Sequence, residues 1–162
     1  MKYKNDKVKK EVEKINKEAE LAVEQIRKIT KGSVEEYNEA MNNGLPTNLT
    51  ELYRLRGRAI KPYCNHSGWT DSTPYEVVNV ISGQTVEIRY MHSELIEDDM
   101  KFTSGGFVGH FSNQESQKYK YESAENQKPI RARWSKAKEE WVSSRGRHSM
   151  ADAPYRFYDF NF

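Results

Sequence analysis

The sequence predicts an α+β protein, in which a long N-terminal helix and a short helical hairpin precede a small antiparallel β-barrel of SH3-like size. Two observations predict this class. Apolar residues near the N-terminus recur with heptad spacing, whereas from Tyr75 onward they alternate with polar residues, as in half-buried strands. We therefore expect a helical region at 1–61, a linker at 62–74 and a β-domain at 75–162.

Length and composition limit the classes that the chain fits. Its 162 residues suffice for one ordinary domain, or for a small domain with a helical extension. No segment approaches the ~20 apolar residues of a membrane span, and no apolar run follows the basic N-terminus as a signal peptide requires. The single cysteine excludes an internal disulfide framework. We expect a cytoplasmic protein that does not contact the membrane.

The net charge of +2 hides a segregation along the chain. Residues 1–32 carry a net charge of +4, residues 33–129 carry −5, and residues 130–162 carry +3. This pattern fits neither a uniformly basic nucleic-acid binder nor an acidic DNA mimic. Local basic patches are therefore the candidates for contact with an anionic partner.

The N-terminus predicts one long helix, because Lys4 to Lys31 contains neither glycine nor proline. The unbroken 4-3 spacing of its apolar residues is typical of a coiled coil. We expect this helix to pair two copies of the chain or to dock a partner, with Ile15 and Ile26 at the contact. The alternative is that the stripe packs on the β-domain or on the next helices. The stripe comprises Val8, Val12, Ile15, Ala19, Ala22, Ile26 and Ile29.

Two short helices are predicted next, on either side of a glycine-containing turn. Ser33 and Glu36 form a capping box before the first, and Asn48 with Glu51 repeats the pattern before the second. This outline resembles a helix-turn-helix, whose cations would contact phosphates and base edges. The alternative is a helical connection whose arginines balance the acidic middle of the chain. The cations concerned are Arg54, Arg56, Arg58 and Lys61.

Metal and catalytic sites are not predicted. Cys64 and His66 form one pair with ligand spacing, whereas a zinc site usually shows two such pairs. No serine or histidine lies in a nucleophile elbow or in a second pair with metal-ligand spacing. We expect neither an enzyme nor a bound cofactor.

Alternating stretches predict the strands of the β-domain. Residues 75–81 and 85–90 flank the turn Ser82-Gly83-Gln84 and predict a first hairpin. Residues 118–122 and 130–134 also alternate, and we expect them to form a central hairpin around a polar turn. Four cations would then lie together on its solvent face, opposite either the acidic segment at 94–99 of the same chain or the anionic groups of a partner. They are Lys118, Lys120, Arg131 and Arg133.

The C-terminal stretch predicts a loop followed by an aromatic tail. Residues 143–154 are basic and rich in small residues, which is typical of a mobile surface loop. The tail from Tyr155 to Phe162 holds five aromatic residues and would be costly to leave in water. We expect it to close the barrel as a last strand or to fill an apolar groove, either here or on a partner.

Four motifs carry a resemblance to known proteins: Gly105-Gly106, Gln117-Lys-Tyr-Lys-Tyr-Glu122, Arg131-Ala-Arg-Trp134 and Tyr158-Asp-Phe-Asn-Phe162. From Gly105 to Phe162 the chain resembles a loose group of small phage and mobile-element proteins that share this pattern. The resemblance implies a phage-like origin, a compact β-fold and no catalytic residues.

The resemblance also suggests a partner, because small non-enzymatic phage proteins with a docking helix often inhibit host defence nucleases. By this analogy we expect a protein that binds and inhibits a host defence protein in the host cytoplasm, of anti-CRISPR or anti-restriction type. The partner would be a host protein or a protein–nucleic-acid complex. The alternative is a nucleic-acid-binding regulator that uses the helical hairpin and the basic β-face.

Overall fold

The structure is a computed structural model, and it describes residues 1–42, 46, 48–96, 102–103, 110–111 and 116–160. The helices are α1 (Asp6–Lys31), α2 (Val34–Asn42) and α3 (Leu49–Gly57). The strands are β1 (Lys2–Tyr3), β2 (Tyr63–Ser67), β3 (Ser72–Ser82), β4 (Thr85–Leu95), β5 (Phe102–Thr103), β6 (His110–Phe111), β7 (Tyr119–Ser123), β8 (Ile130–Ser135), β9 (Glu140–Ser143) and β10 (Gly146–Ala151). The predicted α+β class, with a long N-terminal helix and an antiparallel barrel, is confirmed.

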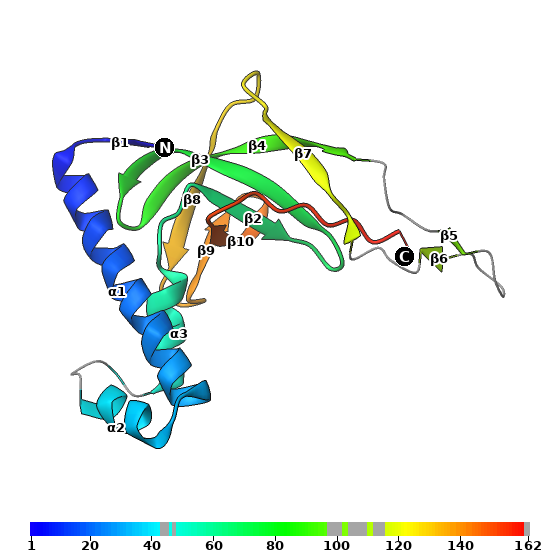
Figure 1. Cartoon of the computed structure of the whole chain (residues 1–162). Helices are drawn as coiled ribbons and strands as arrows, with labels where there is room; N and C mark the ends of the chain where they lie inside the picture. Colours follow the sequence, from blue (N-terminus) through cyan, green and yellow to red (C-terminus); the bar gives the residue numbers. More distant parts are fainter. Residues whose placement is uncertain (43–45, 47, 97–101, 104–109, 112–115, 161–162) are drawn as a thin grey trace.

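Six strands close into the antiparallel β-barrel (Figure 1). Their order around the barrel is β3, β2, β10, β9, β8 and β4, and β4 pairs back with β3. Short β1 adds a parallel pairing to β3, while β7 pairs with the second half of β4. The predicted hairpin around Ser82-Gly83-Gln84 is confirmed, because β3 and β4 pair on either side of that turn.

Most of the barrel interior is one apolar cluster. On β8, Ala132 and Trp134 are buried while Arg131 and Arg133 are exposed, as the alternation of a half-buried strand requires. Trp141 on β9 packs edge-on against Trp134, with 5.9 Å between ring centroids, and donates its indole N–H to the Gly57 carbonyl oxygen at 3.2 Å. Strands β2, β3 and β4 supply Cys64, Tyr75, Val77, Val80, Val86 and Ile88.

Helix α1 covers one end of the barrel and continues past it toward α2, with α3 beside it (Figure 1). Asn5 caps its start by accepting the Val8 N–H at 3.0 Å. The first turns bring Val8 and Val12 into the barrel core. Farther along, α1 packs against α3, where the buried residues are Ala22, Ile26 and Leu52.

The heptad seam is therefore packed within the chain, which is the second of the two alternatives from the sequence. Ile15 is 7% exposed and Ile26 is 9% exposed. A second copy or a partner helix would have to displace the barrel or α3 to reach them. Heptad spacing predicts an apolar stripe but does not specify what covers it. Residues 1–61 also share a core with the barrel and are not an independent unit.

The expected linker at 62–74 is wrong, because most of it belongs to the barrel wall. Strand β2 pairs with β10 on one side and β3 on the other, and β3 already begins at Ser72. Within β2 only Cys64 is fully buried. A strand with one apolar anchor among polar residues does not show the alternation by which strands are recognised.

The expected central hairpin is also wrong, although both of its strands exist. Strand β7 pairs with residues 91–95 and β8 pairs with residues 85–88, which are successive segments of β4. The two strands therefore lie end to end along one neighbour and do not pair with each other. Alternation determines which face of a strand is buried, but not which strand lies beside it.

The predicted mobile loop at 143–154 is wrong, because it contains β10. This strand closes the barrel between β9 and β2. The tight turn before it requires Gly146, whose φ of +118° is a conformation that other residues rarely adopt. A segment rich in serine, arginine and glycine is typical of a loop. It forms a strand here because the backbone hydrogen bonds that close the barrel do not require apolar side chains.

The described part of the C-terminal tail runs as a strap across the barrel. Its backbone N–H groups at Tyr155 and Arg156 donate to Asn65 Oδ1 at 3.0 Å and to the Tyr121 hydroxyl at 2.9 Å. Phe157 forms an isolated bridge with Ser72. The tail thus ties β2 and β3 to β7, and it does not become a strand of the closed barrel.

Some sequence expectations fall on residues that the structure does not describe. Residues 104–109 of the expected β-domain lie outside the described residues, and β6, which follows them, pairs with β5. Gly105 and Gly106 of the resemblance lie outside the described residues, as do positions 97–99 of the acidic segment. No helix among the described residues is both long enough and apolar enough to cross a membrane.

Candidate functional site

The outer face of β8 and β9 brings basic side chains together. Arg131 and Arg133 both point outward, because the residues between and after them are buried. Arg133 stands opposite Val142 of β9. In the connecting turn, Ser135 accepts the Lys138 backbone N–H at 3.2 Å, which shapes the turn next to the arginines.

A hollow of about 430 Å³ lies between these residues, and we call it the basic hollow. Its described lining consists of three cations, three serines and a valine, with no carboxylate among them: Arg131, Arg133, Lys138, Ser135, Ser143, Ser144 and Val142. The nearest counter-charge is Glu87, whose Oε1 lies 3.8 Å from Arg131 Nε, too far for a hydrogen bond. Arg133 and Lys138 form no ion pair with any described residue. The basic hollow therefore has the charge to attract an anion.

Lys118 and Lys120 do not join this surface. Lys120 lies on β7, opposite Glu94, and its ammonium is 3.1 Å from the Glu122 carboxylate. The hydrogen bond to Glu122 raises the pKa of Lys120, with a smaller contribution from Glu94. The predicted four-cation face is thus divided: the arginines lie in a carboxylate-free hollow, whereas Lys120 has acidic neighbours.

The cations of the helical hairpin are also separated. Arg54 pairs with Glu51 at 3.0 Å, and Lys61 pairs with Asp152 at 2.5 Å. The guanidinium of Arg56 stacks on the Tyr53 ring, 5.0 Å from its centroid. Arg58 has a buried Nε without a hydrogen-bond partner. These four side chains do not form a common surface for a nucleic-acid backbone.

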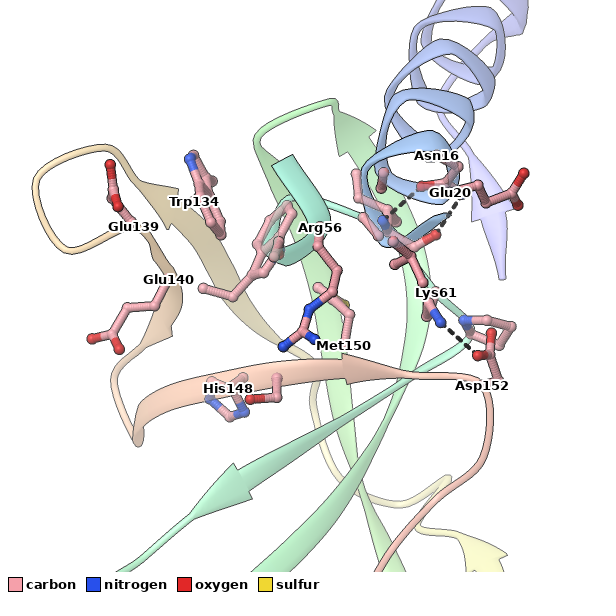
Figure 2. A pocket seen from close by; sticks show the side chains of 18 of the residues that line it. Asn16, Glu20, Arg56, Lys61, Trp134, Glu139, Glu140, His148, Met150 and Asp152 are labelled. Atoms are coloured by element: carbon pink, nitrogen blue, oxygen red, sulfur yellow. Dashed lines mark hydrogen bonds and ion pairs between the residues drawn. The ribbon is translucent and has the colours of Figure 1, made fainter. Parts of the chain in front are cut away.

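Arg56 and Lys61 instead line a groove of about 740 Å³ between the helices and strands β9 and β10 (Figure 2). Asn16 of α1 fixes one wall, since its amide donates to the Ile60 carbonyl oxygen at 2.9 Å and accepts the Ile60 N–H at 2.8 Å. Four carboxylates line this groove against the two cations: Glu20, Glu139, Glu140 and Asp152. Such a surplus of negative charge disfavours a phosphate.

A buried polar cluster inside the barrel was not predicted from the sequence. His148 is 4% exposed, its Nε2 lies 2.7 Å from Ser143 Oγ, and its Nδ1 lies 3.9 Å from Cys64 Sγ. Burial, helped by nearby His66, lowers the pKa of His148 to about 4. Burial also raises the pKa of the Cys64 thiol to about 12. The thiol is therefore protonated at neutral pH, and a nucleophilic thiolate is not available.

The sequence contained a usable signal for one of the residues that we missed in the basic hollow. Lys138 lies in the turn between two alternating segments, so hairpin geometry places it beside Ser135. For His148 there was no signal, because Cys64 is distant in the chain and the nearby partner Ser143 lies in the segment that was expected to be a loop. Among the described residues, no group of three potential ligands is arranged to hold a metal ion.

The fold and this surface define a class: a helix-capped, six-stranded β-barrel protein with a basic hollow on its outer wall. Comparison with protein-family models, with curated proteins and with solved structures found no match.

Proposed function

We propose that this chain is a non-catalytic interaction protein that binds an anionic partner through the basic hollow. The observation that carries the proposal is the convergence of Arg131, Arg133 and Lys138 without a carboxylate in the lining. Ser135 and Ser144 add hydroxyl groups beside them. Guanidinium groups with nearby hydroxyls bind carboxylates and phosphates through charge-assisted hydrogen bonds. The protonated state of buried Cys64 removes the only cysteine of the chain as a candidate nucleophile.

The first candidate partner is a host defence protein, such as a CRISPR effector or a restriction nuclease. This partner, a phage or mobile-element origin and a location in the host cytoplasm are proposals from the resemblance of the C-terminal third. An acidic surface on such a protein would complement the basic hollow. Inhibition would follow if the bound protein covers the partner's own working surface.

The second candidate partner is nucleic acid, because the hollow also suits a phosphate backbone. Arg131 and Arg133 are two residues apart on one face of a strand, so both guanidiniums reach the same side. We assign this contact to β8 and not to α3, since Arg54 and Lys61 are held in ion pairs.

The experiment compares two double variants of the full chain. Arg131→Ser with Arg133→Ser removes two charges from the basic hollow, whereas Lys118→Ser with Lys120→Ser removes the same charge at and just before β7. Capture of partners from a host lysate is measured with and without nuclease treatment. We expect the arginine variant to lose capture, and the lysine variant to keep it. Equal capture by wild type and the arginine variant would refute the basic hollow as the binding surface.

Salt distinguishes the two partners. Binding to a labelled oligonucleotide should weaken more than about tenfold between about 50 and 200 mM salt, because condensed counterions are released when phosphates are neutralised. A protein partner should remain bound after nuclease treatment and should respond less to salt.

A further inference from the structure

The end of the barrel opposite α1 contains a cavity of about 490 Å³. Two cross-strand pairs form its walls: Ile88 with Ile130, and Tyr75 with Tyr90. The cavity opens where β8 begins at Ile130, because β7 takes over the pairing with β4 beyond that point. A change of neighbouring strand therefore leaves a gap in the barrel wall.

The walls of this cavity are held by ring packing. Tyr75 is almost fully buried and meets Tyr90 edge-on at 6.0 Å between centroids. On its other side Tyr75 meets the His148 ring at 5.2 Å and 90°. Edge-to-face contacts of this kind favour one arrangement of the rings. The cavity is thus preformed, with an apolar body of two tyrosine rings and two isoleucines.

The rim carries hydrogen-bond donors and positive charge. Arg145 comes from the β9–β10 turn, and Gln127 and Lys128 come from the segment that joins β7 to β8. Both segments are shaped by local bonds: the Arg145 N–H donates to Ser143 Oγ at 3.0 Å, and the Gln127 N–H donates to the Ala124 carbonyl oxygen at 2.9 Å.

These donors have no acceptors in the described part of the chain. Arg145 and Lys128 form no ion pair with a described residue, and the hydroxyls of Tyr75 and Tyr90 hydrogen-bond to none. None of the described residues that line the cavity carries a carboxylate. Burial raises the pKa of Tyr75, although the Arg145 charge opposes the shift, so the phenol is a proton donor at neutral pH.

We propose that this cavity binds a small amphipathic anion, with an apolar body against the isoleucines and tyrosines and a carboxylate or phosphate group at Arg145 and Lys128. The volume falls within the range of small-molecule sites, and the mouths of β-barrels are a usual place for them. This site is distinct from the basic hollow, because Arg131 and Arg133 lie on the outer wall and do not line the cavity.

The test titrates the full chain with octanoate, octyl phosphate and octanol. Binding is followed by NMR of isoleucine methyl groups, with Ile15 at the α1 end as the internal reference. We expect an anion to shift the Ile88 and Ile130 signals, and octanol to bind at least about tenfold more weakly because it lacks the charge. The preferred anion identifies the head group.

Two variants test the charge at the rim. Arg145→Gln should weaken octanoate binding about tenfold, the loss of one charge-assisted hydrogen bond. Lys136→Gln removes one charge from the distant β8–β9 turn and should leave binding unchanged. The proposal is overturned if no anion shifts Ile88 and Ile130 at millimolar concentration, if octanol binds as well as octanoate, or if both variants behave alike. Arg131→Ser with Arg133→Ser should not affect octanoate, so the two sites are tested separately.

Discussion

Ala124 donates its backbone N–H to the carbonyl oxygen of Tyr90 at 3.2 Å, and this bond marks the point where β4 changes partners. Before it, β4 pairs with β8; after it, β4 pairs with β7. Strand β4 can pair with both β8 and β7 because it is 11 residues long, about twice the usual length of a strand. This change of partner strand opens the cavity beside Tyr90. It also separates Lys118 and Lys120 from the arginines of β8.

The seam of α1 should contribute to folding and not to self-association. Ile15→Ala or Ile26→Ala should lower the free energy of unfolding by about 2–4 kcal/mol each, because both side chains are buried within the chain. Leu21→Ala, on the exposed side of the same helix, should change it by less than about 0.5 kcal/mol. Urea unfolding measures the difference. Unchanged stability together with a loss of dimer in light scattering would place the seam at an intermolecular contact.

His148 should make the protein less stable in acid. Its pKa in the folded state is about 4, against an ordinary value of 6.5, so the unfolded chain takes up a proton more readily. The stability is fully present above pH 6.5 and is lost as the pH falls toward 4, by about 3 kcal/mol.

The measurement compares urea midpoints between pH 7 and pH 4.5. His148→Gln should reduce the dependence on pH, whereas His92→Gln, at an exposed position on β4, should keep it. An identical pH dependence in wild type and His148→Gln would show that this imidazole is not the group responsible.

Gly83 should be sensitive to any side chain. A Cβ added there would lie 2.6 Å from Ile15 Cδ1 and 2.5 Å from Glu11 Oε1, so the ends of both side chains would have to move in the packed contact between α1 and the β3–β4 turn. We expect Gly83→Val to cost about 1–3 kcal/mol through overpacking, measured by thermal unfolding. Gly68→Ala is the comparison, because its Cβ would meet nothing closer than 3.4 Å. Equal melting temperatures for the two variants would contradict this close approach.

The C-terminal strap should loosen when one hydroxyl is removed. Tyr121→Phe deletes the acceptor of the Arg156 N–H and should cost about 1 kcal/mol. Amide hydrogen exchange should then be faster at Arg156, while Trp141 in the barrel core remains protected. Unchanged exchange at Arg156 would mean that the strap is held without this bond.

Parts of the candidate site could be predicted from local sequence. Arg131 and Arg133 alternate with Ala132 and Trp134, so their outward direction follows from the period of a strand. The prediction that Lys118 and Lys120 lie beside them failed, because it assumed that neighbours in sequence pair in the sheet. Strand pairing depends on the whole barrel, and here β7 and β8 pair with successive segments of β4 and not with each other.

The amino-acid sequence by itself determined the local features: the stripe from Val8 to Ile29, the hairpin turn at Gly83 and the two faces of β8. Each depends on residues a few positions apart, whose spacing matches the 3.6 or 2.0 periodicity of the backbone. Only the tertiary structure decided what covers the α1 stripe, that β2 and β10 are strands, and that Arg145 reaches the cavity of Tyr75. These features depend on contacts between distant segments, and closure of the barrel supplies backbone partners even to strands whose side chains are largely polar.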